Sequence, residues 1–187
     1  MNRRLFLQTS GSLVLAGSGS LLLPVEALAI TGEQDFWRRD RVLELRRADT
    51  GELRRIRFYA AGQGYLKDGW LAARWMLRDA KDGNAVTNVD TGLLNLLYGL
   101  QEWARTAGKT APLLTINSAY RTPRRNASIE GAARHSQHVR GRAVDVTMRG
   151  VGVNQLAAMA AHFNAGGIGL YERFIHLDTG RVRNWRG

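Results

Sequence analysis

The clearest pattern near the start of the chain is an alternation of apolar residues with arginines. Residues 41–47 read RVLELRR and residues 53–59 read LRRIRFY, so apolar side chains recur at about every second position. The residues between them, 48–52, read ADTGE and supply turn chemistry. We therefore predict a β-hairpin with one face against the core and an arginine-rich face in solvent.

Three segments carry helical periodicity instead. The strongest is residues 90–107, where leucines fall on one stripe behind an N-cap candidate, Asp90, and before a natural stop at Gly108. Residues 70–79 and 154–164 are shorter and amphipathic. We expect the apolar stripes of all three helices to face the core.

Short apolar runs predict four further strands, at residues 113–117, 143–148, 168–171 and 174–178. The segment that follows residue 123 is polar and fits a helix or a loop. Because the strands and helices do not alternate as βαβ units, the pattern favours the α+β class.

The first 29 residues have the features of an export signal. An arginine pair at positions 3–4 precedes a mildly apolar stretch, residues 13–23, and small residues that suit cleavage follow. Paired arginines with modest hydrophobicity favour the twin-arginine type. The apolar stretch is broken by glycines and is shorter than the ~20 residues that span a membrane. We expect no stable membrane anchor after cleavage, and a single domain, residues 30–187, in the periplasm.

Charge and composition narrow the partners. The formal net charge is +11, and loss of Arg3, Arg4 and Glu26 with the signal leaves +10. Such a charge attracts polyanions, including the carboxylate-rich cell wall. The arginines are spread along the chain, so we expect no nucleic-acid partner. Without cysteine, a metal site must use histidine and carboxylate ligands.

The candidate chemistry gathers around Asp145, which interrupts an apolar run. A carboxylate in such a run usually binds a metal, a cation or a hydrogen-bond network. If strands 143–148 and 174–178 pair, His176 meets Asp145 across the ladder. His138 lies upstream, beyond Gly141, a residue that lets the chain turn back. Two imidazoles and one carboxylate leave a fourth position open on zinc, as in catalytic sites, and suit hydrolysis of an amide.

Residues 136–145 read SQHVRGRAVD and match S-x-H-x-x-G-x-A-x-D in full. This segment resembles the signature of the zinc D-Ala-D-Ala metallopeptidases and related cell-wall endopeptidases of the hedgehog-type superfamily. The hairpin, the SAYR segment at 118–121 and the closing segments 167–171, 174–180 and 183–185 are similar to the YcbK-like subgroup of periplasmic murein endopeptidases.

The resemblance implies a small, mainly antiparallel central sheet with flanking helices, preceded by the hairpin. It also implies an exported enzyme that uses one Zn²⁺ ion to hydrolyse the peptide cross-links of peptidoglycan. By the same resemblance His138, Asp145 and His176 are the metal ligands. Arg121 would bind the substrate carboxylate or the tetrahedral oxyanion, and Ser136 would contact the substrate beside the metal.

The general base is the point where the chain departs from the pattern. The D-Ala-D-Ala dipeptidases place a carboxylate three residues before the last ligand, and here that residue is Arg173. Asp178 shares a face with His176 and is our first choice, although it could equally orient His176. Glu172 and His135 are the other candidates.

Two other functions fit the same residues. One is a D,D-carboxypeptidase, and the other is a non-catalytic cell-wall-binding protein that keeps a structural zinc site. The missing carboxylate at position 173 motivates the second. Within the endopeptidase class, two bonds stay open: the link from D-alanine to diaminopimelate and the link between two diaminopimelates.

Overall fold

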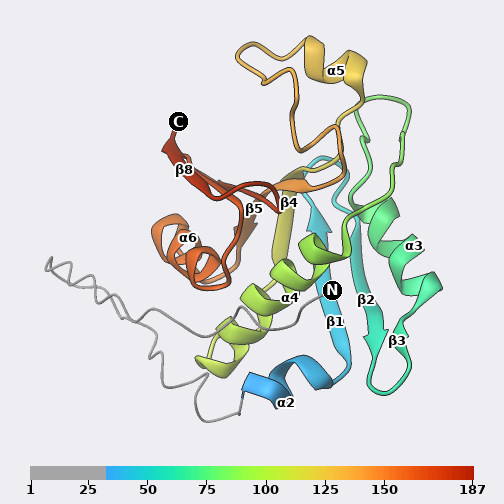
Figure 1. Ribbon diagram of the computed structural model, residues 1–187, viewed down its shortest axis with the longest axis vertical. Helices are drawn as coiled ribbons and strands as arrows, with labels where there is room; N and C mark the ends of the chain where they lie inside the picture. The colour runs from blue at the N-terminus through green and yellow to red at the C-terminus, as the bar shows by residue number, and fades with distance from the viewer. Residues whose placement is uncertain (1–32) are drawn as a thin grey trace, which may run out of the picture.

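A computed structural model describes residues 33–187, so the predicted signal peptide lies outside the described residues. The described chain is a mixed structure of helices around a curled sheet (Figure 1). The strands are β1 Arg41–Arg47, β2 Leu53–Ala60, β3 Gly64–Tyr65, β4 Leu114–Ser118, β5 Ala143–Met148, β6 Gly167–Leu170, β7 Ile175–Asp178 and β8 Arg183–Arg186. The helices are α2 Glu33–Arg38, α3 Lys67–Met76, α4 Thr91–Thr106, α5 Pro123–Ala127 and α6 Val153–His162.

All eight strands belong to one sheet, in the order β3-β2-β1-β4-β5-β7-β6-β8. Among the described residues five pairings are antiparallel, and two, β1 with β4 and β6 with β8, are parallel. The sheet is therefore larger than the small one that was predicted. The hairpin β1–β2 forms as expected, but it supplies two of the eight strands of this sheet rather than standing in front of it.

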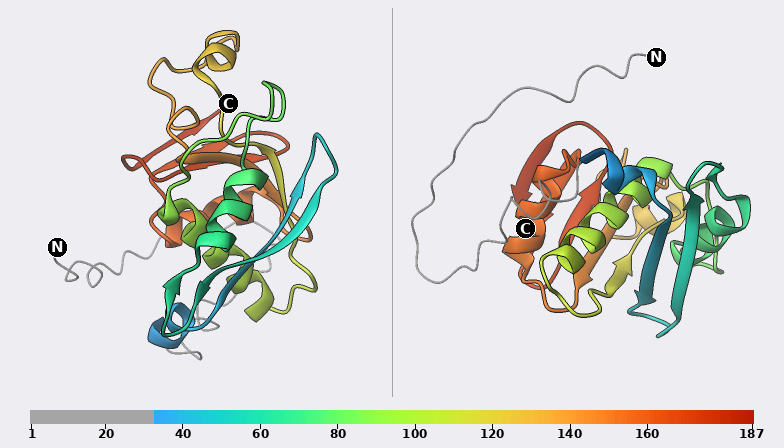
Figure 2. Two further views of the ribbon diagram at one scale, coloured as in Figure 1. Left: turned by 90° about the vertical axis from the view of Figure 1, so that its right-hand side faces the viewer. Right: turned by 90° about the horizontal axis from the view of Figure 1, so that it is seen from below.

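Helices α3, α4 and α6 cover the apolar side of the sheet. Helix α3 packs on β2 and β1, while α4 contacts β1 and α6, and Figure 2 shows α4 between α6 and the hairpin. The leucine stripe of α4 is buried, and the Asp90 side chain accepts a hydrogen bond from the Gly92 amide at 2.8 Å, as the sequence predicted for an N-cap. One continuous cluster of buried apolar residues joins these helices to the sheet.

Helix α4 also compensates for a gap in the sheet. Strand β4 pairs only with the end of β1, from Leu45 onward, which leaves the first part of β1 without a neighbour on that side. The side chain of Gln101 takes that place. It accepts from the Glu44 amide at 2.9 Å and donates to the Glu44 carbonyl at 3.0 Å. Gln101 is fully buried, so these bonds satisfy polar groups that burial would otherwise make costly.

The sequence located most elements and missed three. Helix α3 begins and ends three residues earlier than predicted. Strand β8 lies in the arginine-rich tail, and neither β3 nor α2 was predicted. Among residues 33–187 no helix combines the length and the apolar character needed to cross a membrane.

Candidate metal centre

The register of three neighbouring strands brings the first two candidate ligands together. Asp145 on β5 lies opposite His176 on β7, as the alternation predicted, and opposite Ser118 on β4. The neighbouring valines, Val144 and Val146, are fully buried in the core. Because side chains alternate along a strand, burial of the valines turns Asp145 to the other face of the sheet, where His176 lies.

His138 reaches the same place from the loop before β5. Gly141 closes this loop with a positive φ of 66°, and its amide donates to the His138 carbonyl at 3.2 Å. A Cβ atom at position 141 would lie 2.3 Å from the carbonyl oxygen of Asn88. Glycine is therefore required here both for the turn and for the close approach to the segment before α4.

Three donor atoms converge between these elements. His138 Nε2 lies 3.1 Å from His176 Nδ1 and 3.3 Å from Asp145 Oδ1, and His176 Nδ1 lies 2.9 Å from Asp145 Oδ1. Ligand atoms at about 2.0–2.1 Å from a tetrahedral ion lie roughly 3.3 Å apart. The triangle is thus slightly tighter than the ligand set of a zinc ion, and all three residues are buried.

The other ring nitrogens are already committed. His138 Nδ1 lies 2.6 Å from the Ala119 carbonyl, which can only accept a hydrogen bond, so Nδ1 is the donor. His176 Nε2 lies 3.0 Å from Asp178 Oδ2, which is also an acceptor. Neutral rings that donate there present their remaining lone pairs to one another and to Asp145. Three facing lone pairs repel unless a cation or a proton lies between them, so the residues fit a metal ion.

The electrostatics of the three residues agree with this arrangement. Burial lowers the pKa of His138 and keeps its imidazole neutral. Burial opposes ionisation of Asp145, but the two adjacent imidazoles and the charge of Arg121 hold its pKa well below the usual range. Burial also opposes charge on His176, but the flanking carboxylates of Asp145 and Asp178 raise its pKa, so a metal competes with a proton at Nδ1.

Asp178 lies behind His176, on the side of the ring away from the donor triangle. It is fully buried, and both of its oxygens accept several hydrogen bonds. Besides His176 Nε2, its donors are the amides of Gly167 and Gly180, at 2.9 and 2.8 Å, and two nitrogens of Arg183, at 3.1 and 2.6 Å. Burial would raise the pKa of Asp178, but these bonds lower it well below the usual range.

Arg121 and Ser136 both contact the ligand residues. Arg121 Nη2 donates to Asp145 Oδ2 at 2.5 Å, and its Nε donates to Ser118 Oγ at 2.9 Å. Among residues 33–187 its Nη1 has no hydrogen-bond partner. The hydroxyl of Ser136 accepts from the His138 amide at 3.2 Å, which ties it to the backbone of the ligand loop.

The remaining candidates for the general base lie outside this network. His135 and Glu172 are both exposed, as is Arg173, which occupies the position of the missing carboxylate. Within residues 33–187 neither His135 nor Glu172 hydrogen-bonds to a residue of the donor triangle. Sequence reasoning missed Arg183 and the Ala119 carbonyl. Arg183 lies in the segment 183–185, whose resemblance to the subgroup suggested no role for the arginine. The Ala119 carbonyl is a backbone group, which residue types do not single out.

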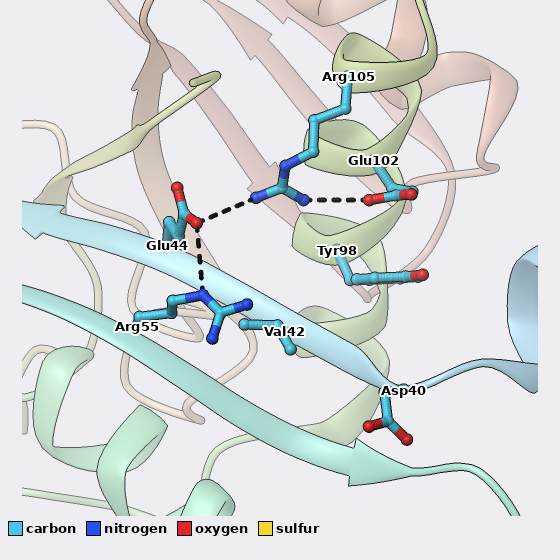
Figure 3. Close-up of a pocket in the computed structure, with 7 residues that line it drawn as sticks. All are labelled: Asp40, Val42, Glu44, Arg55, Tyr98, Glu102 and Arg105. Carbon is cyan, nitrogen blue, oxygen red and sulfur yellow. Dashed lines mark hydrogen bonds and ion pairs between the residues drawn. The ribbon is translucent and has the colours of Figure 1, made fainter. Parts of the chain in front are cut away.

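Apart from these residues, a hollow lies between the hairpin and α4 (Figure 3). Its cavity measures about 250 Å³, and four of its five charged side chains pair with one another. Arg105 bridges Glu44 and Glu102 at 3.7 and 3.1 Å, and Arg55 lies 3.6 Å from Glu44. Asp40, the remaining charged residue of the lining, pairs with Arg57 at 2.7 Å, so every charge there has a partner and we assign the hollow no function. It is lined by Asp40, Val42, Glu44, Arg55, Tyr98, Glu102 and Arg105.

Two imidazole nitrogens and one carboxylate oxygen beside a curled sheet are typical of metal-dependent hydrolases. The chain belongs to the family Peptidase_M15_2, whose model, described as peptidoglycan L,D-endopeptidase MepK, matches residues 37–185. It is 32% identical to the peptidoglycan L,D-endopeptidase MepK of Escherichia coli (strain K12) over 190 residues, which cover 98% of this chain and 97% of that protein.

A more distant relative covers the same length. The chain is 29% identical to the probable peptidoglycan L,D-endopeptidase MepK of Haemophilus influenzae, over 100% of this chain and 96% of that protein. The predicted resemblance to the YcbK-like murein endopeptidases is confirmed, and the chain is a peptidase of that kind.

Proposed function

We propose that this chain hydrolyses an L,D amide bond in the cross-links of peptidoglycan, with one zinc ion held by His138, Asp145 and His176. The proposal rests on three lone pairs that converge on one point. Both imidazoles use their N–H groups in hydrogen bonds on the opposite side of the ring. The names of the relatives supply the substrate class. Of the two bonds that the sequence left open, the link between two diaminopimelates joins an L to a D centre.

Each protein group has a defined task in this proposal. A bound zinc ion supplies Lewis acidity, which polarises the amide carbonyl and acidifies water. Arg121 fixes the orientation of Asp145 through Nη2 and presents Nη1 to a carboxylate or an oxyanion of the substrate. Ser136 stabilises the backbone of the ligand loop beside the metal and faces the substrate there.

Asp178 then has the second of the two roles that the sequence allowed. Its oxygens accept five hydrogen bonds, and it contacts the ring of His176 rather than the open side of the donor triangle. We infer that it holds the tautomer and the orientation of His176 and is not the proton acceptor. Glu172 and His135 stay the candidates for the base.

Export belongs to the same proposal. Peptidoglycan lies outside the cytoplasmic membrane, so we infer that residues 1–29 direct the chain to the periplasm by the twin-arginine route and are removed there. The positive charge that remains favours approach to the carboxylate-rich wall. We assign the domain, residues 30–187, to the hedgehog-type peptidase fold.

Digestion of two purified muropeptide dimers tests the function, one cross-linked through an L,D bond and one through a D,D bond. Mass spectrometry should find the first cleaved and the second intact, and a chelator or His138→Ala should stop the cleavage. Release of terminal D-alanine would identify a carboxypeptidase instead. Intact dimers with zinc bound and sacculi retained would identify a non-catalytic wall-binding protein.

A further inference from the structure

The last strand of the chain packs against the metal site across two glycines. Strand β8 runs parallel to β6, with Arg183 opposite Gly167 and Trp185 opposite Gly169. A Cβ atom at position 167 would lie 2.3 Å from Asp178 Oδ2 and 2.5 Å from Arg183 Nη1. At position 169 it would lie 2.6 Å from the indole of Trp185. Because both glycines lack a Cβ atom, the side chains of Arg183 and Trp185 can extend across β6 toward β7.

Arg183 uses this room to hold Asp178 in a two-point contact. Its Nη1 donates to Oδ1 at 3.1 Å and its Nη2 donates to Oδ2 at 2.6 Å. An exposed ion pair contributes little, but here the carboxylate is fully buried and the planar fork fixes its orientation. Asp178 Oδ2 also accepts from His176 Nε2, so the orientation of Asp178 determines that of the His176 ring.

Trp185 supports the same ring from the side. The centroids of its ring and of the His176 ring lie 5.1 Å apart, and its Nε1 donates to the Tyr171 hydroxyl at 3.1 Å. The guanidinium of Arg183 lies 5.0 Å from the Trp185 ring centroid. Arg183 and Trp185 thus form one packed unit on β8, whereas Asn184 and Arg186 point to the exposed side.

We propose that Arg183 is a positioning residue of the metal site, which acts through Asp178 on the orientation of His176 and thereby sets the affinity for zinc. The inference rests on the proposed function, because it takes zinc as the metal. Asp178 is two residues from His176 and is a neighbour that a sequence motif can suggest. Arg183 comes from a strand that forms only when the tail adds to the edge of the sheet.

The test measures the zinc dissociation constant of the purified chain by competition with a chromophoric chelator, and the melting temperature of the metal-free chain. Arg183→Gln should weaken zinc binding about 10–100-fold, as loss of an outer partner of a ligand does. The zinc dissociation constant of Arg183→Lys should lie between those of the native chain and of Arg183→Gln, because an ammonium keeps the charge but not the two-point contact. Arg186→Gln, on the exposed side of the same strand, is the matched control and should change the constant less than about twofold.

Two further variants separate positioning from a general effect on the fold. Gly167→Ala places a Cβ atom against the Asp178 carboxylate and should also weaken zinc binding. In an Asp178→Asn background Arg183→Gln should add less than about twofold, because the residue through which it acts has already changed. A cobalt-loaded Arg183→Gln chain should also show an altered visible absorption spectrum, which reports the geometry of the ligands.

A folded Arg183→Gln chain that binds zinc within twofold of the native chain would overturn the inference and leave the proposed function standing. If that variant does not fold, native zinc affinity in both Arg183→Lys and Gly167→Ala would overturn it equally. Conversely, a native chain that binds zinc but leaves both muropeptide dimers intact would refute the proposed function, while the effect of Arg183 on zinc affinity would still hold.

Discussion

Residues 33–187 bury clusters of charged side chains at the metal centre and at the junction of β1 with the end of α3. At the junction Arg47 and Asp79 are almost completely buried. Arg47 donates to both oxygens of Asp49, at 2.9 and 2.7 Å, and to the carbonyl of Met76, at 2.6 Å. Asp79 accepts from the Thr122 amide and from Arg125, both at 2.9 Å. In each of these contacts a donor faces an acceptor.

At the metal centre that balance is broken at one point. His138, His176 and Asp145 are buried too, but their three inner atoms all carry lone pairs. Burial of charge therefore does not distinguish a functional site from a structural one in this protein. The excess of acceptors does, because only an added cation or proton can satisfy it.

The largest expected effect is that of a ligand removed from the metal centre. Loss of an outer partner of a ligand weakens metal binding by up to about 100-fold, and loss of the ligand itself should weaken it more. His138→Ala should therefore weaken zinc binding by more than about 100-fold and abolish cleavage of the L,D dimer. The melting temperature of the metal-free chain should stay near that of the native chain, because repelling lone pairs are lost. Arg140→Gln, an exposed change in the same loop, is the control. Full activity in His138→Ala would show that His138 is not a ligand of the catalytic metal.

The junction should respond in the opposite way. Asp79→Ala leaves the guanidinium of Arg125 and the amide of Thr122 without their acceptor, so the free energy of unfolding should fall by about 3–5 kcal/mol. Urea unfolding measures this loss. The zinc affinity of the folded chain should stay within about twofold of native. Glu130→Ala, at an exposed position, should cost less than about 0.5 kcal/mol.

Asp178→Asn separates the two roles of that residue. If Asp178 positions His176, both zinc affinity and kcat/KM should fall by about 10–100-fold. If it were the general base, catalysis should vanish while zinc affinity stayed native. Measuring the zinc dissociation constant beside the rate of dimer cleavage distinguishes the outcomes, with Arg186→Gln again as the control.

The smallest effect concerns pH at the junction. Hydrogen bonds from Arg47 hold the pKa of Asp49 below its usual value, although burial opposes them. A depressed pKa stabilises the fold above the unfolded pKa of about 3.9, and this contribution is lost as the pH falls through the folded value. Asp49→Asn should therefore cost about 1.5 kcal/mol at pH 7. The difference from the native chain in urea unfolding should shrink as the pH falls below the unfolded pKa, and a constant difference would contradict the assignment.

Local pattern in the sequence predicted much of this structure. The hairpin, strand β5 and the N-cap of α4 follow from alternation and capping residues. Strand alternation together with the family resemblance predicted that His138, Asp145 and His176 would meet. Strands β3 and β8 were missed because each is short and completes its hydrogen bonds only on an existing sheet edge. The size of the sheet was missed for the same reason, since β1 joins β4 across more than sixty residues of sequence.

The sequence by itself determined which residue types could bind a metal and on which strand faces they lie, because side-chain alternation is a local property of the backbone. Only the tertiary structure decided what those residues contact from behind. The direction of the Asp178 carboxylate, the reach of Arg183 across Gly167 and the bond from His138 to the Ala119 carbonyl depend on strand order and register. These are set by long-range packing, which no short segment of the chain encodes.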